Sequence, residues 1–414
     1  MASETLKLGN AEKLKQGFAW NATLSAFHHF EKMRILHVIP SLSSVHGGPS
    51  TALPLMERAL LAAGVEAETI TTDDDGPGRR NGRVLGQALK ENGVIRRYFA
   101  KRFEFYKVSP GLGRWARREV KNYDVVHVHA LFSHTSLAAA RAARAAGVPY
   151  VIRPLGVLNR YGMTRRRALL KKLSFRWLEG PLLRDAAAVH FTSEAEREEA
   201  EGLGVPMRSV VVPLGLELPE GGTGPEEREP VVLYLSRIDP KKNLEGLLRA
   251  WGGLAAEFPK WRLAVAGDGE ADHVRWLRAM AEELGLGDRV KWLGRIEGGV
   301  KQQWLRESGV YVLPSFSENF GIAAVEAMGA GLPCLLGEGV AVAQDAAKAG
   351  GCILTAPDEE SIRSKLRMLL SDAARRHETG AAAREFAVKE YGLEGMGRRL
   401  FELYARILER PGEI

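Results

Sequence analysis

The stretch VYVLPSFSENFGIAAVEAMGAG, residues 310–331, combines a short apolar strand, a turn with proline and glycine, and a run of small residues suited to a helix. Two carboxylates in it, Glu318 and Glu326, are eight positions apart. A helix that opens at such a turn presents free backbone N–H groups to an anion, and carboxylates accept hydrogen bonds from hydroxyls. The stretch therefore predicts a site for a ligand with phosphate and hydroxyl groups, such as a sugar nucleotide.

Short β-rich runs alternate with longer helical patterns on both sides of this stretch, which is typical of parallel α/β units. A chain of 414 residues exceeds the usual size of one core. We therefore expect two doubly wound, Rossmann-like domains that face a central cleft. The strands are expected at Ile35–Ile39, Glu68–Thr72, Phe105–Val108, Val125–His129, Tyr150–Arg153, Ala188–Thr192, Val210–Val212, Val231–Ser236, Leu263–Ala266, Val290–Leu293, Val310–Leu313, Cys334–Leu336 and Cys352–Leu354.

The domain boundaries follow from composition. Residues 1–32 precede Met33 and the first strand, and they do not match a signal peptide. Residues 217–230 are rich in proline, glycine and glutamate, as expected of a linker. We predict an N-terminal extension over 1–32, a first domain over 33–216, the linker over 217–230, a second domain over 231–390, and a C-terminal helix over 391–414 that crosses back to the first domain.

Composition limits the class of protein. Two cysteines fit neither a disulfide scaffold nor a zinc module and favour a reducing cytoplasm. No apolar run is long enough to span a membrane. The net charge of +7 suits anionic ligands, but no aromatic-rich motif or zinc pattern favours nucleic acid. The basic segment Arg165–Arg176 fits either a surface helix packed on the core or a helix on an anionic membrane.

Charged and glycine-rich motifs follow several expected strands, where α/β sheets bind ligands. Arg237 and Lys242 are separated by a turn, so both can reach one diphosphate, or they can belong to a solvated basic turn. The glycines of two other loops allow backbone to approach a phosphate, although each loop could be a simple turn. These loops contain Gly47-Gly48 and Gly267-Asp268-Gly269.

Three further groups lie at strand ends in the first half. His127 and His129 share one face of a strand; we expect no metal there, because no third ligand has suitable spacing. His129 is the better placed to reach a ligand. Arg153 closes the next strand and fits a ligand contact or a structural salt bridge. The triplet Asp73-Asp74-Asp75 could hold a divalent metal, but we interpret it as a solvated acidic loop.

Together these motifs resemble the retaining, nucleotide-sugar-dependent glycosyltransferases of group 1, or family 4, which have the GT-B fold. The resemblance covers roughly Met33 to the C terminus. Its most specific element is Glu318 and Glu326 with Asn319-Phe320-Gly321 between them. The remaining motifs occur in the order of the family, namely Gly47-Gly48, His129, Arg237 with Lys242, and Gly267-Asp268-Gly269.

The resemblance implies a role for each donor-binding residue. Arg237 and Lys242 would bind the diphosphate and stabilise charge as the nucleotide leaves. Glu326 would accept hydrogen bonds from the ribose hydroxyls. Glu318 and the backbone N–H groups of Asn319-Phe320-Gly321 would hold the donor sugar. The two carboxylates would therefore bind hydroxyls rather than act as an acid–base pair.

The other motifs acquire roles in the same way. Gly47 and Gly48 would close over the phosphates from the first domain, and His129 would contact the sugar near the reacting carbon. The loop with Arg295 and Ile296 resembles the one that lines the base. Arg153 is the acceptor-side candidate, because the first domain normally holds the acceptor.

One departure concerns the acceptor side. The segment Pro154-Leu155-Gly156 replaces a histidine-containing turn that is commoner in the family. Similar segments occur in relatives that build surface polysaccharide or lipopolysaccharide.

We therefore expect a cytoplasmic glycosyltransferase, peripheral at the inner membrane face, that needs neither metal nor cofactor. Its donor would be a nucleoside diphosphate sugar and its acceptor a glycan or a lipid-linked molecule. Two alternatives are a nucleotide-sugar epimerase of the same fold, and a nucleotide-binding subunit of a glycan-biosynthesis complex without turnover. The spacing of the two glutamates disfavours the epimerase, and the intact Arg237, Lys242, Glu318 and Glu326 disfavour the inactive subunit.

Overall fold

The computed structural model describes residues 33–46, 48–158, 174–219, 228–318 and 320–410. The chain forms two compact units, one made of Met1–Gly215 with Leu393–Ile414 and the other of Leu216–Gly392. Several sequence-based predictions lie outside the described residues: the extension over 1–32, Gly47, most of the basic segment 165–176, most of the linker and Asn319.

The first unit contains a sheet of eight strands in the order β3-β4-β2-β1-β5-β6-β7-β8. All neighbours pair in parallel except β3 and β4, which are antiparallel. The strands are β1 (Arg34–Val38), β2 (Glu66–Thr72), β3 (Leu89–Glu91), β4 (Val94–Phe99), β5 (Val125–His129), β6 (Tyr150–Arg153), β7 (Ala188–Phe191) and β8 (Ser209–Val211).

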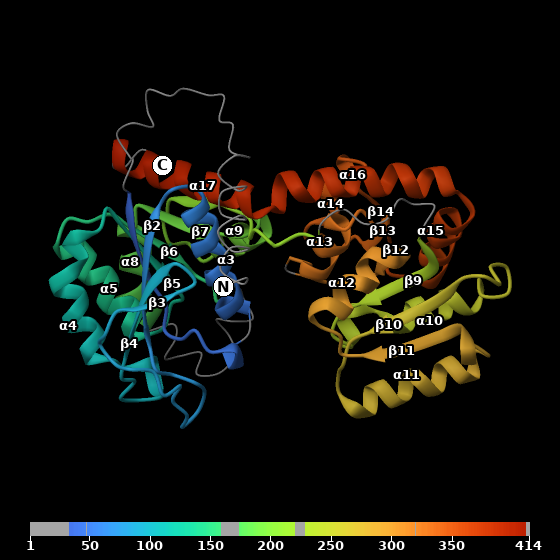
Figure 1. Cartoon of the computed structure of the whole chain (residues 1–414), viewed down its shortest axis with the longest axis horizontal. Helices are drawn as coiled ribbons and strands as arrows, with labels where there is room; N and C mark the ends of the chain where they lie inside the picture. Colours follow the sequence, from blue (N-terminus) through green and yellow to red (C-terminus); the bar gives the residue numbers. More distant parts are fainter. Residues whose placement is uncertain (1–32, 47, 159–173, 220–227, 319, 411–414) are drawn as a thin grey trace, which may run out of the picture. The chain divides into compact units, whose positions relative to one another are not determined.

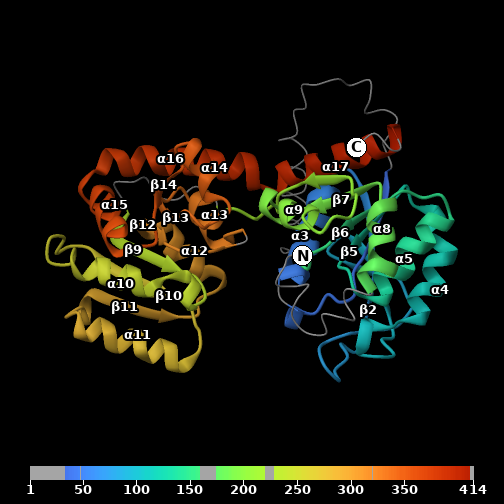
Figure 2. The same ribbon diagram turned by 180° about the vertical axis from the view of Figure 1, so that it is seen from behind.

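Helices cover both faces of this sheet (Figure 1). Helices α3 (Gly48–Ala62) and α17 (Leu393–Glu409) pack together on one face, where Ile35, Val125 and Val151 join the apolar cluster. Figure 2 shows the flank formed by the helices on the other face. These are α4 (Pro110–Glu119), α5 (His134–Ala145) and α8 (Gly180–Asp185), with α9 (Glu194–Glu201) near β7 and β8.

The second unit contains a fully parallel sheet in the order β11-β10-β9-β12-β13-β14. Its strands are β9 (Glu229–Leu235), β10 (Arg262–Ala266), β11 (Val290–Gly294), β12 (Ser308–Leu313), β13 (Cys334–Gly337) and β14 (Cys352–Thr355). Its helices are α10 (Leu244–Gly252), α11 (Ala271–Glu283), α12 (Gly298–Glu307), α13 (Ile322–Gly329), α14 (Ala343–Lys348), α15 (Glu359–Ser371) and α16 (Ala373–Tyr391).

The predicted fold class is confirmed: both units are Rossmann-like, and the C-terminal helix α17 belongs to the first unit. The order of the parallel strands reverses between β1 and β5 in the first unit and between β9 and β12 in the second. Ligands of doubly wound sheets bind at such reversals, outside the carboxyl ends of the strands. The loops after these four strands are therefore where a site is expected.

One predicted strand is wrong. Residues Phe105–Lys107 form a 3-10 turn, in which Tyr106 and Lys107 have positive φ angles of 59° and 45°. A strand cannot pass through such left-handed residues. The place beside β2 is taken by Val94–Phe99, whose two central arginines obscured its strand character in the sequence.

Candidate active site

A cavity of about 470 Å³ in the second unit lies at the carboxyl ends of its strands. It is lined from the loops after β9, β10, β11 and β12, and from the start of α13. Ten of the residues predicted from the sequence line this one cavity, namely Arg237, Lys242, Gly267, Asp268, Arg295, Ile296, Glu318, Phe320, Gly321 and Glu326.

The loop after β9 brings two cations to the cavity. Asp239 caps the 3-10 turn Pro240–Lys242 by accepting a hydrogen bond from the Lys241 amide at 3.0 Å. Asn243 then adopts a left-handed conformation and begins α10. These two local signals turn Lys242 inward, where it is 8% exposed, whereas Arg237 remains exposed. Burial and the nearby Arg237 guanidinium lower the pKa of Lys242.

Lys242 contacts Glu318, which follows β12, through an ion pair between Nζ and Oε2. The two loops are also joined by the Phe316 amide, which donates to the Lys241 carbonyl at 2.9 Å. A carboxylate that neutralises the buried ammonium leaves Arg237 as the accessible cation of the pair. Guanidinium groups match phosphate oxygens with two parallel hydrogen bonds.

The glycines of the β10 loop have a packing role. A Cβ on Gly267 would lie 1.9 Å from the Ser236 carbonyl oxygen, and one on Gly269 would lie 2.1 Å from the Ile238 carbonyl oxygen. The Ile238 amide donates to the Asp268 carbonyl at 2.7 Å. These glycines therefore let the β10 loop lie against the β9 loop that holds Arg237. Gly267 lines the cavity and Gly269 does not.

Helix α13 presents its N-terminal turn to the cavity through Gly321, Ile322 and Ala323. Gly321 has a φ of 89°, and a Cβ there would lie 3.0 Å from Val340, so the turn requires glycine. The amides of the first helical turn have no partner within the helix and favour an anion. Glu326 lies one turn further along the same helix, with its side chain 14% exposed.

Lys301 lines the cavity but was not predicted from the sequence. Lys301 of α12 pairs with Glu326, with 2.6 Å between Nζ and Oε1. The sequence offered no signal for this pair, because the two residues are separated by 25 positions and lie on different helices. The pair holds one oxygen of Glu326 and leaves the other for a ligand hydroxyl.

The site residues predicted in the first unit do not line this cavity. Gly48 opens α3, whereas His129 and Arg153 end adjacent strands and are 0% and 4% exposed. The acidic triplet was interpreted wrongly as solvated. Asp73 and Asp74 are buried, and Asp74 accepts from His46 and Lys107 at 2.8 Å each.

Asp74 also forms an ion pair with Lys101. Burial alone would raise the pKa of Asp74, but the hydrogen bonds from Lys101 and Lys107 lower it below its usual value. The triplet therefore stabilises the loop that precedes the Gly47-Gly48 motif.

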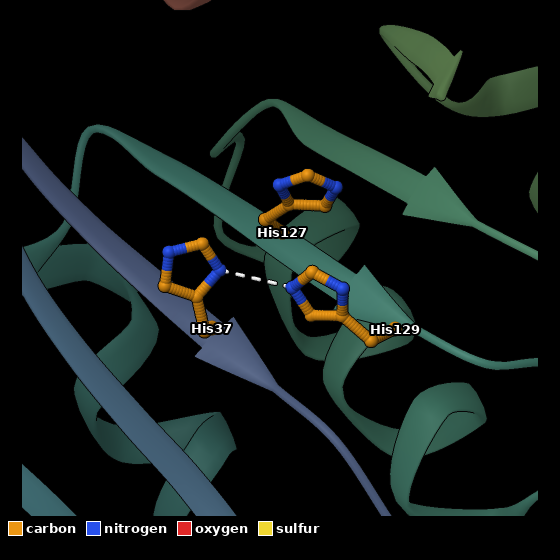
Figure 3. A group of neighbouring side chains, drawn as sticks. All are labelled: His37, His127 and His129. Atoms are coloured by element: carbon orange, nitrogen blue, oxygen red, sulfur yellow. Dashed lines mark hydrogen bonds between the residues drawn. The ribbon is translucent and has the colours of Figure 1, made fainter. Parts of the chain in front are cut away.

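His127 and His129 do have a third imidazole beside them. His37 of β1 brings a ring nitrogen within 4.8 Å of theirs (Figure 3). Spacing could not reveal this, because His37 is 92 positions from His129. His37 Nδ1 and His129 Nε2 share a hydrogen bond of 3.0 Å. The prediction that His127 and His129 lack a third candidate ligand is therefore wrong.

The hydrogen bonds of the cluster nevertheless disfavour a cation. His190 Nε2 lies 2.9 Å from the Val212 carbonyl oxygen and must donate to it, so Nδ1 of neutral His190 accepts from His127 Nε2 at 3.4 Å. His127 Nδ1 then accepts from the Tyr404 hydroxyl at 2.7 Å. Both nitrogens of His127 are occupied. Burial is the main cause that lowers the pKa of all four histidines, and the neighbouring histidines and the cationic Arg153 lower it further.

Comparison with known proteins agrees with this geometry. The family model for glycosyl transferases group 1 matches residues 221–386, which include all the residues that line the cavity, and the model for a glycosyl transferase 4-like domain matches residues 47–215. The chain belongs to the group 1 glycosyltransferases. Within the described residues of this group 1 glycosyltransferase, no helix combines the length and hydrophobicity that a membrane crossing requires.

Individual relatives are distant. A GDP-mannose:cellobiosyl-diphosphopolyprenol alpha-mannosyltransferase of Xanthomonas oryzae is 25% identical over 92% of this chain and 98% of its own. A GDP-mannose-dependent mannosyltransferase of Corynebacterium glutamicum that acts on a phosphatidylinositol monomannoside is 29% identical, over 41% of this chain and 46% of its own. Anabaena HepE in complex with UDP has a TM-score of 0.69 at 19% identity and covers 89% of this chain and 99% of HepE, which supports the fold.

Proposed function

We propose that the protein transfers a sugar from a nucleoside diphosphate sugar to a glycan or lipid-linked acceptor, with retention of anomeric configuration and without a metal. The observation that carries this proposal is the convergence of Arg237, Lys242, Glu318 and Glu326 on one cavity at the strand-order reversal of the second sheet. The names of the relatives, which include GDP-mannose enzymes with diphosphate-lipid or phosphatidylinositol acceptors, support the same class of donor and acceptor.

The cavity supplies what the reaction needs electrostatically. Breaking the anomeric C–O bond develops positive charge on the sugar and negative charge on the departing diphosphate. Arg237 and the amides at the start of α13 are fixed donors for that negative charge, and fixed donors stabilise it without reorganising. The departing phosphate would accept the acceptor proton on the face from which the acceptor attacks, so the configuration is retained. No carboxylate has to act as a base.

Donor binding can be tested by thermal unfolding with UDP-glucose, GDP-mannose and ADP-glucose. A ligand at 100 times its dissociation constant adds about 2.7 kcal/mol of stability, which raises the melting temperature measurably. We expect one nucleotide class to stabilise the protein more than the others at equal concentration. Equal, negligible shifts for every donor would contradict the proposal. Retention would be checked by the anomeric coupling constant of the product in proton NMR.

Replacing Glu326 with glutamine should weaken binding of the nucleoside diphosphate about tenfold. The carboxylate accepts hydrogen bonds from hydroxyls more strongly than an amide, and hydrogen bonds to charged groups contribute about 1.5–3 kcal/mol. Calorimetric titration measures the change. Glu307→Gln is the matched control, because Glu307 ends the same helix that carries Lys301, is exposed and lies outside the cavity. Equal affinities for the two variants would rule out the ribose contact.

A further inference from the structure

Most of the charged side chains that line the cavity of the second unit are joined in ion pairs. Among the described residues these pairs are Lys242–Glu318, Arg295–Glu297 and Lys301–Glu326. The side chains of Arg295 and Glu297 are 68% and 70% exposed, and exposed pairs contribute little. Those of Lys301 and Glu326 are only 25% and 14% exposed, so water and salt screen their attraction less. Lys301 is the cation whose role the donor chemistry leaves open.

Lys301 occupies a position that is unfavourable for a cation. It is the fourth residue of α12, and its amide donates to the Glu297 carbonyl at 3.4 Å at the start of that helix. The first turn of a helix carries the positive end of the helix dipole, which repels a cation. Partial burial of the ammonium adds a desolvation cost. The carboxylate of Glu326 offsets both costs, so the two side chains act as one unit.

The pair fixes the carboxylate of Glu326 within the cavity. Lys301 Nζ lies 2.6 Å from Oε1, and Oε2 accepts no hydrogen bond in the described part of the chain. A glutamate side chain is long and flexible, and a ligand that orders such a side chain loses affinity through the lost entropy. Because Lys301 orders Glu326 beforehand, the ligand meets a carboxylate that is already oriented.

We propose that Lys301 is a positioning residue that holds Glu326 for the ribose of the donor and thereby makes the protein select ribonucleotides over 2′-deoxyribonucleotides. This inference rests on the proposed function, in which Glu326 accepts hydrogen bonds from ribose hydroxyls. An ionised carboxylate has about four lone-pair sites, of which Lys301 occupies one. The remaining sites can accept from the 2′- and 3′-hydroxyls together, whereas a 2′-deoxyribose offers one hydroxyl fewer.

The charges argue against a direct contact between Lys301 and the diphosphate. Such a contact would bring the Glu326 carboxylate, which lies beside the ammonium, close to an anion that it repels. In the described part of the chain Arg237 forms no ion pair within 4.0 Å, so its charge is available for the diphosphate. Glu326 also lies one turn beyond the amides at the start of α13, which favour the anion. The pair therefore faces the neutral part of the nucleotide.

Calorimetric titration of the full chain with UDP, GDP and ADP, and with the 2′-deoxy counterpart of each, measures this selectivity. For the nucleotide that binds most tightly, the wild type should prefer the ribonucleotide at least about tenfold, because hydrogen bonds to charged groups are strong. Lys301→Met keeps an apolar stem and removes the charge. It should weaken binding of the ribonucleotide about tenfold and lower the preference below about threefold. An unchanged preference in Lys301→Met would overturn the proposal.

Two further variants separate positioning from a general effect on α12. Lys301→Arg keeps a cation that can donate to Glu326, so it should recover most of the preference for the ribonucleotide. A preference in Lys301→Arg no greater than that of Lys301→Met would contradict the role of the cation. Gln303→Met is the matched control, because Gln303 is exposed on the same helix and does not line the cavity. An equal loss of preference in this control would also overturn the proposal.

A double-mutant cycle tests whether Lys301 acts through Glu326. In a Glu326→Gln background, Lys301→Met should change nucleotide affinity by less than about twofold, because the group that it positions is already altered. A further tenfold loss would show that Lys301 contacts the nucleotide itself and would overturn the positioning role. If Lys301→Met alone does not fold, the double variant still provides this comparison, since it leaves neither charge of the pair without its partner.

Donor turnover gives a second readout that a structural role would not produce. Lys301→Met should raise the KM for the nucleotide sugar more than it lowers kcat, because the ribose contact is made before and during the reaction alike. A fall in kcat with an unchanged KM would contradict the proposal. Absence of UDP, GDP and ADP binding by the wild type would overturn the proposed function together with this inference. Nucleotide binding whose ribose preference does not depend on Lys301 would overturn this inference alone.

Discussion

Alanine at position 237 is expected to lower the turnover of the nucleotide sugar by at least about a hundredfold. Arg237 lines the cavity beside Lys242, whose ammonium is already paired with Glu318. The guanidinium of Arg237 is therefore the cation that can stabilise the negative charge that develops on the departing diphosphate. Removing one fixed donor to such a charge costs about 10²–10³ in turnover, and removing an arginine from a phosphoryl site can cost more.

The matched control is Lys241→Ala. Lys241 lies in the same loop but is exposed and does not line the cavity, so its loss should change turnover by less than about twofold. The measurement is the rate of nucleoside diphosphate release at saturating donor, together with the dissociation constant of the diphosphate. Turnover should fall more than affinity, because the developing charge exceeds that of the bound donor. Near-normal turnover of Arg237→Ala would contradict the assignment.

Acid should destabilise the first unit steeply. Burial lowers the pKa of His37 and His190 to about 3 and holds the pKa of His127 and His129 well below its usual value. An unfolded histidine has a pKa of about 6.5. Between the folded and unfolded values the unfolded chain binds more protons. The contribution of these histidines to stability is therefore present above pH 6.5 and is lost as the pH falls below it.

The size of the effect follows from the unfolded pKa alone. On going from pH 7.5 to pH 5.5, each histidine that stays neutral in the folded protein costs about 1.4 kcal/mol, so the four together cost about 5.5 kcal/mol. Urea unfolding of the first unit at the two pH values measures this loss. His37→Gln should make the loss about 1.4 kcal/mol smaller, whereas His377→Gln, at an exposed position on α16, should not change it.

Histidine NMR gives an independent check. Four of the ten histidines should keep the chemical shifts of neutral rings down to pH 5, with His190 protonated on Nε2 and His127 also on Nε2. Titration of all ten with ordinary midpoints would refute the buried, neutral cluster.

The parts of the fold and site that the sequence predicts are those with local signals. The positions of Arg237, Gly267 and Glu318 after strands could be predicted from the sequence, because each strand and the loop that follows it are contiguous in the chain. Parallel sheets then bring the loops to one edge, and ten of the predicted residues line one cavity there. The role of each in donor binding stays a prediction, as do the contact proposed for His129 and the membrane contact of residues 165–176.

What the sequence did not predict depends on long-range contacts. The Lys301–Glu326 pair, the third imidazole of His37 and the burial of Asp74 arise between segments that are far apart in the chain. Charge misled the interpretation of Asp74, because three consecutive aspartates are usually solvated, whereas here the second pairs with two lysines and accepts a hydrogen bond from a histidine. In β4, the arginines at 96 and 97 pair with Glu57 and Glu68, so the strand tolerates charge.

The most direct test of the proposed glycosyl transfer is release of nucleoside diphosphate from the best-binding donor, in the presence of EDTA and without acceptor. The cavity predicts slow hydrolysis to the nucleoside diphosphate and free sugar, unaffected by EDTA and abolished by Arg237→Ala. Absence of release from every UDP, GDP and ADP sugar that binds the protein, with or without added divalent metal, would contradict it.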